Sequence, residues 1–277
     1  MISKQDNLPQ PSHAGCKQGP DLHRGEKADL PMAQLTRDQF LKMMAAGTAS
    51  FLGLQSTSYG QEVPKGPLVP WSRLKFIGEM GDDQDWHVHP HGDLNLIDSI
   101  RDQTSVNLEK KWNIADVDDL NSMVQYPFLF MHGEIAPILN AQSRQNLREY
   151  LMRGGFLFAE DCVHGYAHHG YSNLNDYFFR AMAEEMTSLL PGATFERLSM
   201  DHPLFHCFYQ FDTWPHMQGT EHGPWGLTYN GRLAALLSPS DLHCAWTNGD
   251  VWFGPEKRIA AMQMGTNIYM HAMTQVT

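Results

Sequence analysis

Short apolar runs that alternate with helical patterns constrain the fold of this 277-residue chain more than any other feature. Strands covered on both faces appear as nearly continuous apolar runs, and Tyr126-Pro-Phe-Leu-Phe-Met131 has this character. Apolar residues repeat at helical spacing over residues 174–189, and Pro191-Gly192 ends that helix. Long crossovers connect parallel strands, so the pattern predicts a three-layer α/β/α domain with a mainly parallel sheet.

The same patterns place the individual elements. A helix with Asp93 as its cap has Leu94, Ile97 and Ile100 at helical spacing, and a second helix ends at Gly154 after residues 141–153. The predicted strands cover residues 73–78, 105–112, 126–131, 156–160, 194–199 and 232–238. Residues 212–255 are rich in glycine and proline, and we expect them to be too irregular to consist only of sheet and helix.

The charge balance narrows the class of partner. With 20 Lys and Arg against 31 Asp and Glu, the formal net charge is -11, and nucleic acid is therefore not an expected partner. Of the 15 histidines, 13 lie at or after His87, which enriches the domain in the side chain best suited to metal ligation and proton transfer. This enrichment motivates a search for a metal site.

The N-terminal residues differ in character from the rest of the chain. Residues 1–31 are polar and proline-rich, which predicts a disordered tail. Residues 32–60 are similar to a twin-arginine export signal, although Asp38 stands where the second arginine belongs. Residues 61–72 form an expected linker, and residues 73–277 a single α/β domain. We therefore expect an exported, periplasmic protein without a transmembrane helix, the alternative being a cytoplasmic protein with a short amphipathic helix.

Titratable groups follow five of the predicted strands. Ligands in open α/β sheets bind beyond the carboxyl ends of the strands, so these groups predict a binding rim. Asp82 and Asp83 follow the first strand. The rim residues after the other strands are His132 after the third, Asp161, Cys162 and His164 after the fourth, Asp201 and His202 after the fifth, and Asp241 and His243 after the sixth, with His168 and His169 further along the fourth loop. The competing explanation is that loops are polar in any protein.

The segments that carry these groups also carry a family resemblance. Residues 73–273 resemble the bacterial domain of unknown function 4159 family through Gly154-Gly-Phe-Leu-Phe-Ala-Glu-Asp161, Asn146-Leu-Arg-Glu-Tyr-Leu151 and Asp201-His-Pro-Leu-Phe205, together with Tyr126-Pro-Phe-Leu and Gly231-Arg-Leu-Ala-Ala-Leu-Leu-Ser238. The resemblance implies a fold similar to the class I glutamine amidotransferases, whose flavodoxin-like sheet carries a nucleophilic cysteine after a central strand. It implies no activity and no catalytic residues.

One chemical hypothesis is a thiol nucleophile at Cys162. That residue stands where amidotransferases have their nucleophile, and His164, with Asp161 beside it, could form the rest of a catalytic set. The glycines of a nucleophile elbow are missing around Cys162, and an adjacent carboxylate raises a thiol pKa. A buried structural cysteine is the alternative.

The second chemical hypothesis is a metal centre. His87, His89 and His91 are two residues apart, so on an extended segment their imidazoles project to one side. With His132, Asp161, His164 or His202 they could bind zinc or another divalent transition metal. A solvated histidine-rich loop explains the spacing equally simply.

The cysteines and tryptophans each allow two structural interpretations. Cys207 and Cys244 could pair as a disulfide in an exported protein, or be packed thiols in a cytosolic one. Tryptophans at positions 214, 225 and 252 could line a groove for a sugar, peptide or protein, or cover the edge of the core. The sequence favours an accessory or ligand-binding component of the cell envelope with an unidentified protein or small-molecule partner. The alternative is a metal-dependent or Cys/His-dependent hydrolase.

Overall fold

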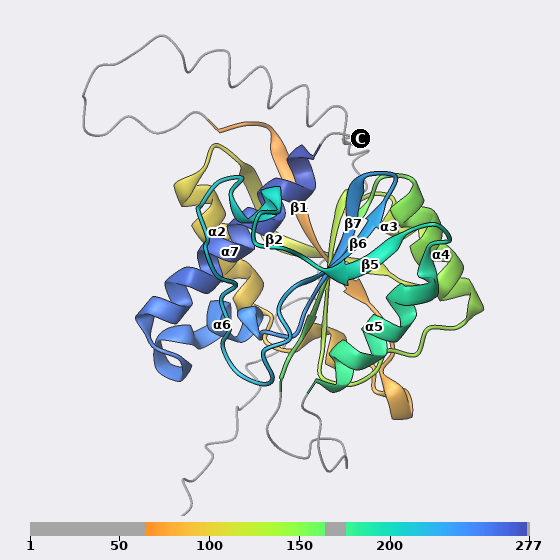
Figure 1. Cartoon of the computed structure of the whole chain (residues 1–277). Helices are drawn as coiled ribbons and strands as arrows, with labels where there is room; N and C mark the ends of the chain where they lie inside the picture. The colour runs from red at the N-terminus through yellow and green to blue at the C-terminus, as the bar shows by residue number, and fades with distance from the viewer. Residues whose placement is uncertain (1–64, 164–175, 276–277) are drawn as a thin grey trace, which may run out of the picture. The chain divides into compact units, whose positions relative to one another are not determined.

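The computed structural model describes residues 65–163 and 176–275. Over these ranges the chain forms a mixed, mostly parallel sheet of seven strands in the order β2-β1-β3-β4-β7-β6-β5, with helices on both faces (Figure 1). The strands are β1 (Leu68–Lys75), β2 (Asn107–Asp116), β3 (Phe128–Gly133), β4 (Phe156–Asp161), β5 (Thr194–Arg197), β6 (Trp225–Tyr229) and β7 (Arg232–Ser238). The predicted α/β class and the mainly parallel sheet are confirmed.

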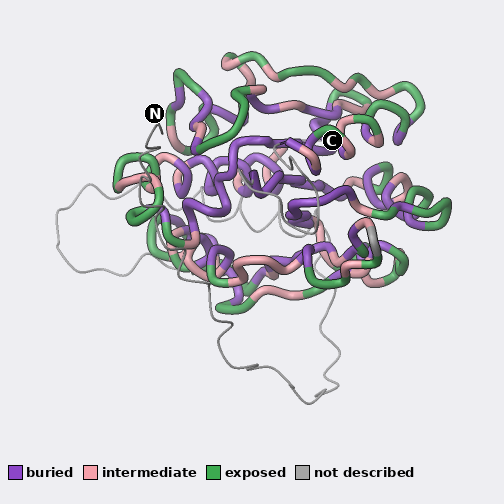
Figure 2. Tube along the Cα trace, turned by 90° about the horizontal axis from the view of Figure 1, so that it is seen from below, coloured by how far each residue is buried: buried purple, intermediate pink, exposed green. Residues whose placement is uncertain are grey.

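Two groups of helices cover the sheet, one on each face (Figure 1). The first group is α2 (His91–Gln103), α6 (Leu242–Trp252) and α7 (Pro255–Thr274), and the second is α3 (Leu120–Met123), α4 (Ala141–Met152) and α5 (Tyr177–Leu189). Short 3-10 turns lie at η1 (Glu79–Gly81), η2 (Asp85–His87) and η3 (Pro203–Phe205). Buried residues lie in the central layer, and exposed residues on the outer helices and loops (Figure 2).

Alternating side chains of each central strand fill two separate cores. Phe128 and Phe130 of β3 pack with α2, α6 and α7, whereas Leu129 and Met131 pack on the opposite face with α4 and α5. A strand buried on both faces must be apolar at consecutive positions. This requirement explains why β3, β4 and β7 were recognisable as apolar runs.

The antiparallel edge of the sheet was not predicted. Strand β6 pairs antiparallel with both β5 and β7, and it lies inside the region rich in glycine and proline, where only the strand over residues 232–238 was predicted. Asn230 and Gly231 connect β6 to β7 with φ angles of 50° and 74°, the combination that a tight two-residue hairpin requires. Helix α6 also begins inside that region and was not predicted. Residues 212–224 contain no helix or strand, in line with the expectation that the region is not all sheet and helix.

Two boundaries on the amino-terminal side also differ from the prediction. Strand β1 begins at Leu68, so residues 68–72 of the expected linker belong to the sheet. Helix α2 begins at His91, and Asp93 lies inside its first turn without capping it. The carboxylate of Asp93 is instead buried against Arg73, which satisfies it away from the helix end.

The tail, the export-signal segment and the first part of the linker lie outside the described residues. In the two ranges that are described, none of the helices has the length and apolar character needed to cross a bilayer.

Candidate metal centre

The carboxyl ends of β3, β4 and β7 bring together residues that are far apart in the sequence. His132 of β3 is in register with Glu160 of β4, which is in register with Ser238 of β7. Cys162 follows β4 directly, and Asp241 to Cys244 lead from β7 into α6. Adjacent parallel strands thus deliver thiol, imidazole and carboxylate groups to one point, as the rule for open α/β sheets predicts.

Five residues form what we call the thiol–imidazole cluster: His89, His132, Cys162, Asp241 and Cys244. The ligand atoms of His132, Cys162 and Asp241 lie within 4.8 Å of one another, as do those of His89, Cys162 and Cys244. Cys162 belongs to both groups, and its Sγ lies 3.6 Å from Sγ of Cys244. Either group could hold a metal ion.

His132 is the least satisfied member of the cluster. Its side chain is fully buried, and neither ring nitrogen has a hydrogen-bond partner within the described residues. Burial, followed by the charges of His243 and Arg73, lowers the pKa of His132 well below its ordinary value, so the ring is neutral and carries a free lone pair. Buried polar atoms without partners are costly and mark places where an ion or water is expected.

The two cysteines are protonated thiols in the absence of a metal. The hydrogen bond to Cys244 and burial raise the pKa of Cys162 well above its ordinary value. For Cys244 the hydrogen bond with Cys162 lowers the pKa, but burial and Asp241 outweigh it and raise the value to about 12. A bound cation reverses this balance, because a coordinating thiol loses its proton. The environment of Cys162 therefore suits a metal ligand better than a free nucleophile.

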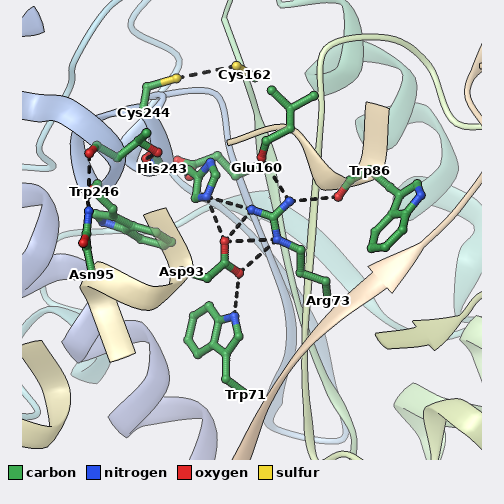
Figure 3. A network of polar contacts seen from close by, with 12 residues as sticks. Trp71, Arg73, Trp86, Asp93, Asn95, Glu160, Cys162, His243, Cys244 and Trp246 are labelled. Atoms are coloured by element: carbon green, nitrogen blue, oxygen red, sulfur yellow. Dashed lines mark hydrogen bonds and ion pairs between the residues drawn. The ribbon is translucent and has the colours of Figure 1, made fainter. Parts of the chain in front are cut away.

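A second buried group, the arginine network, consists of Trp71, Arg73, Asp93 and His243 (Figure 3). Nε1 of Trp71 donates to Oδ1 of Asp93 over 2.7 Å, and Nε of Arg73 donates to both oxygens of Asp93 over 3.0 Å. Nε2 of His243 lies 3.0 Å from Oδ2 of Asp93. Arg73 also donates through Nη1 to the carbonyl oxygens of Trp86 and Val88, both over 3.1 Å.

In the arginine network, the charge of Arg73 is paired with that of Asp93. Burial alone would raise the pKa of Asp93, but Arg73 and His243 overcome this effect and hold it well below its ordinary range. Burial lowers the pKa of His243 to about 4, against the opposing effect of its hydrogen bond to Asp93. Its ring centroid is 4.2 Å from that of His132, so the network lies directly beside the thiol–imidazole cluster.

Glu160 connects the two groups. Its carboxyl accepts hydrogen bonds from the backbone nitrogens of Leu242 and His243 over 2.8 and 2.9 Å, and from Oγ of Ser238 over 3.0 Å. Burial, and then the charge of Asp241, raises the pKa of Glu160 to about 8. Glu160 thus ties the end of β4 to the first turn of α6, the helix that carries Cys244.

The comparison with protein families concerns the segment that contains all of these residues. The family model described as Domain of unknown function (DUF4159) matches residues 73–273. The chain belongs to this family. The search of curated proteins found no match.

Within this DUF4159 domain, the structure separates the predicted metal ligands. His89 joins the cluster, but His87 pairs through Nδ1 with the carbonyl oxygen of Gln84 over 2.6 Å, and His91 begins α2 as an exposed residue. Because η2 and a positive φ of 52° at His89 interrupt the segment, it is not extended. The three imidazoles therefore do not share one side.

The rim converges at three of the five predicted strand ends. Asp201 is exposed, and His202 is half-buried with its ring 5.2 Å from that of His271, so neither joins the cluster. Both follow β5, the edge strand furthest from β3. Asp161 accepts a hydrogen bond from the backbone nitrogen of Phe179 over 2.6 Å and so connects β4 to α5. His164, His168 and His169 lie outside the described residues.

Several residues of this region were not identified from the sequence. Arg73 and Asp93 lie in a strand and a helix whose charged residues are normally expected at the surface, and Glu160 was read as part of an apolar strand. A disulfide between Cys207 and Cys244 was one of two alternatives left open by the sequence, but Cys244 lies against Cys162. The thiol of Cys207 instead donates to the carbonyl oxygens of Leu204 and Asn267 over 3.5 and 3.3 Å.

Proposed function

We propose that this protein binds a thiophilic transition metal ion, zinc in the first instance, at the carboxyl ends of β3, β4 and β7. Cys162 belongs to both ligand groups and supplies sulfur. The remaining ligands come from His132 and Asp241 of one group and from His89 and Cys244 of the other. The observation that carries the proposal is the fully buried His132, which has two ring nitrogens without hydrogen-bond partners in the described residues and lies beside the thiol of Cys162 and the carboxylate of Asp241.

The distance between the two sulfurs supports the proposal. In tetrahedral zinc sites the Zn–S distance is about 2.3 Å, which places two sulfur ligands about 3.8 Å apart. The observed separation of 3.6 Å is close to this value. The pair therefore needs little rearrangement to bind one ion, and mixed sulfur and nitrogen ligands favour zinc or copper over magnesium or calcium.

The surroundings support the proposal as well. Glu160 fixes the backbone of the α6 first turn beside Cys244, and the arginine network packs against His132. Residues that contact the metal ligands and fix their orientation are characteristic of metal sites. We infer that Glu160 and His243 are positioning residues for this centre.

The family resemblance and the sheet together suggest a more specific fold. We propose a class I glutamine amidotransferase-like arrangement, because Cys162 follows β4, the middle strand of the sheet, as the nucleophile does in those enzymes. Here the thiol faces Cys244 and is only 1% exposed. We infer that the residue position used for catalysis in those enzymes is used for binding in this protein.

The proposed role is that of an exported, accessory or ligand-binding component of the cell envelope. This part of the proposal rests on the export-like segment at residues 32–60. N-terminal sequencing of the protein from cells tests it: a mature terminus near Gln61 is expected, whereas an intact Met1 or Met32 would contradict export.

A hydrolase that uses either the metal or Cys162 with a histidine is the second candidate. It is less favoured because His132 and Asp241 are fully buried and Cys162 nearly so, which leaves little room for a substrate. Alkylation with iodoacetamide separates the thiol version from the metal site. We expect Cys162 to react more slowly than the exposed Cys207, and faster reaction would favour the nucleophile.

Metal analysis of protein purified without an affinity tag tests the metal proposal. We expect one equivalent of metal, with loss of binding in Cys162→Ser and in His132→Phe. Cys207→Ser and His202→Gln are matched controls that remove a thiol and an imidazole outside the cluster. Cobalt substitution adds a direct readout, since thiolate ligands give intense near-ultraviolet bands. A metal-free protein that also fails to bind added zinc or cobalt would overturn the proposal.

A further inference from the structure

The two sulfurs of the thiol–imidazole cluster are close enough to react with each other. Sγ of Cys162 and Sγ of Cys244 are 3.6 Å apart, and both side chains are buried. A disulfide has an S–S length of about 2.05 Å, so the sulfurs must approach by about 1.5 Å. A small movement of the two side chains would therefore bring the sulfurs to bonding distance.

The third described cysteine has a different environment. Cys207 donates to two backbone carbonyl oxygens, those of Leu204 and Asn267, and pairs with no thiol in the described ranges. Among the cysteines in the described part of the chain, Cys162 and Cys244 are therefore the pair placed to form a disulfide.

We propose that Cys162 and Cys244 form a redox-sensitive dithiol that closes to a disulfide on exposure to a peroxide, and that closure expels the metal ion. The first half stands on the distance between the sulfurs. The second half deepens the proposed metal-binding function and rests on it, because a sulfur in a disulfide no longer offers the thiolate that a metal requires.

The chemistry balances with hydrogen peroxide or an organic hydroperoxide as the oxidant. One thiol attacks the peroxide, the O–O bond breaks, and the products are a sulfenic acid and water, or an alcohol from a hydroperoxide. The second thiol then attacks the sulfenic sulfur, the S–O bond breaks, and a second water leaves with the remaining proton. Two electrons pass from the two sulfurs to the peroxide, and a dithiol reductant reverses the reaction.

Metal and oxidant compete for the same two atoms. With the ion bound, both sulfurs are engaged at a separation near 3.6 Å and their lone pairs are shared with the cation. Without it, both are available for the bond. The metal-loaded protein should therefore resist oxidation. The metal-free protein should form the bridge, at a rate limited by the burial of both thiols.

The experiment uses the full chain with Cys16→Ser and Cys207→Ser, which leaves Cys162 and Cys244 as the only thiols. The reduced, metal-free protein is treated with hydrogen peroxide, and free thiols, intact mass and non-reduced peptides are measured. Zinc affinity is determined before oxidation, after oxidation and after treatment with a dithiol reductant. Cys244→Ser in the same background is the control that cannot form the bridge.

We expect both thiols to disappear with a loss of two hydrogens in a monomer, a peptide pair joined through Cys162 and Cys244, and zinc affinity reduced at least about tenfold and restored by the reductant. Stable oxidation of one sulfur without the bridge would overturn the dithiol, even if the reduced protein binds zinc. A bridged protein with unchanged zinc affinity would overturn expulsion of the metal. If the bridge forms but the reduced protein binds no zinc, the metal proposal fails and the dithiol stands.

Discussion

The arginine network and the thiol–imidazole cluster are neighbours, and both are buried at the same end of the sheet, but they differ in how their polar atoms are satisfied. In the network, Asp93 accepts hydrogen bonds from Trp71 and Arg73 and lies beside Nε2 of His243, whose Nδ1 is the network atom without a hydrogen-bond partner in the described residues. In the cluster, His132 has no hydrogen-bond partner within the described residues. A buried group with partners contributes to the fold, whereas a buried group without partners costs free energy until a ligand binds. The contrast points to the cluster as the binding site and to the network as its support.

The largest expected effect comes from breaking the network. Asp93→Ala leaves the Arg73 guanidinium buried without its carboxylate, and removing one partner of a buried ion pair costs about 3–5 kcal/mol. Urea denaturation measures the loss. Asp98→Ala, an exposed aspartate on the same helix, is the control and should change the free energy of unfolding by less than about 0.5 kcal/mol. Equal effects of the two substitutions would remove the distinction between the regions.

Removal of the metal should lower the free energy of unfolding by less than Asp93→Ala does. Zinc that binds the folded state stabilises it by about 2.7 kcal/mol at a free concentration 100 times its Kd. Thermal unfolding with zinc or with a chelator measures this difference. Asp93→Ala should retain part of the shift, whereas Cys162→Ser should lose it. An identical Tm with zinc and with chelator would show that the cluster binds no metal in the folded state.

The pH dependence of stability should have opposite signs at His243 and Glu160. The folded-state pKa of His243 is lowered to about 4, so its contribution to stability is lost as the pH falls from about 6.5 to 4. The folded-state pKa of Glu160 is raised to about 8, so stability decreases as the pH rises from about 4.5 to 8, by at most about 1.4 kcal/mol per pH unit. Glu160→Gln should remove that decrease in the metal-free protein. An unchanged slope in this variant would place the titration on another group.

The smallest expected effect is on the stability of the metal-free cluster. His132→Phe removes two buried nitrogens that lack hydrogen bonds, so the free energy of unfolding should change by less than about 1 kcal/mol while zinc binding is lost. Denaturation and zinc titration of the same preparation measure both. A loss comparable to that of Asp93→Ala would mean that His132 is a structural residue in the metal-free protein.

The parts of the fold that were predictable have a single physical character. Strands β3, β4 and β7 are buried on both faces, and each contains four or five consecutive apolar residues. Helix α7 was missed because its residues from Met264 to Tyr269 are all buried, which leaves no apolar stripe at helical spacing. Strand β6 was missed because its neighbourhood is rich in glycine and proline.

The site was predictable in location but not in composition. The rule that ligands bind at strand ends identified His132, Cys162 and Asp241. It could not identify the pairing of Cys162 with Cys244, because the two are 82 residues apart and α6 brings them together. It also assigned Asp201 and His202 to the same rim, since the sequence does not show that β5 lies at the far edge of the sheet.

The pairing of two sulfurs 82 positions apart also affects the unfolded chain. A link between Cys162 and Cys244 closes a ring that contains α5 and the strands β5 to β7. Closing a loop of this length removes chain entropy worth roughly 4.5 kcal/mol from the unfolded state. A disulfide keeps this stabilisation of the folded state when the chain unfolds. A metal ion keeps it only while the ion stays bound to both sulfurs. The kind of link between the two sulfurs therefore determines whether the unfolded state keeps this loss of chain entropy when this part of the domain opens.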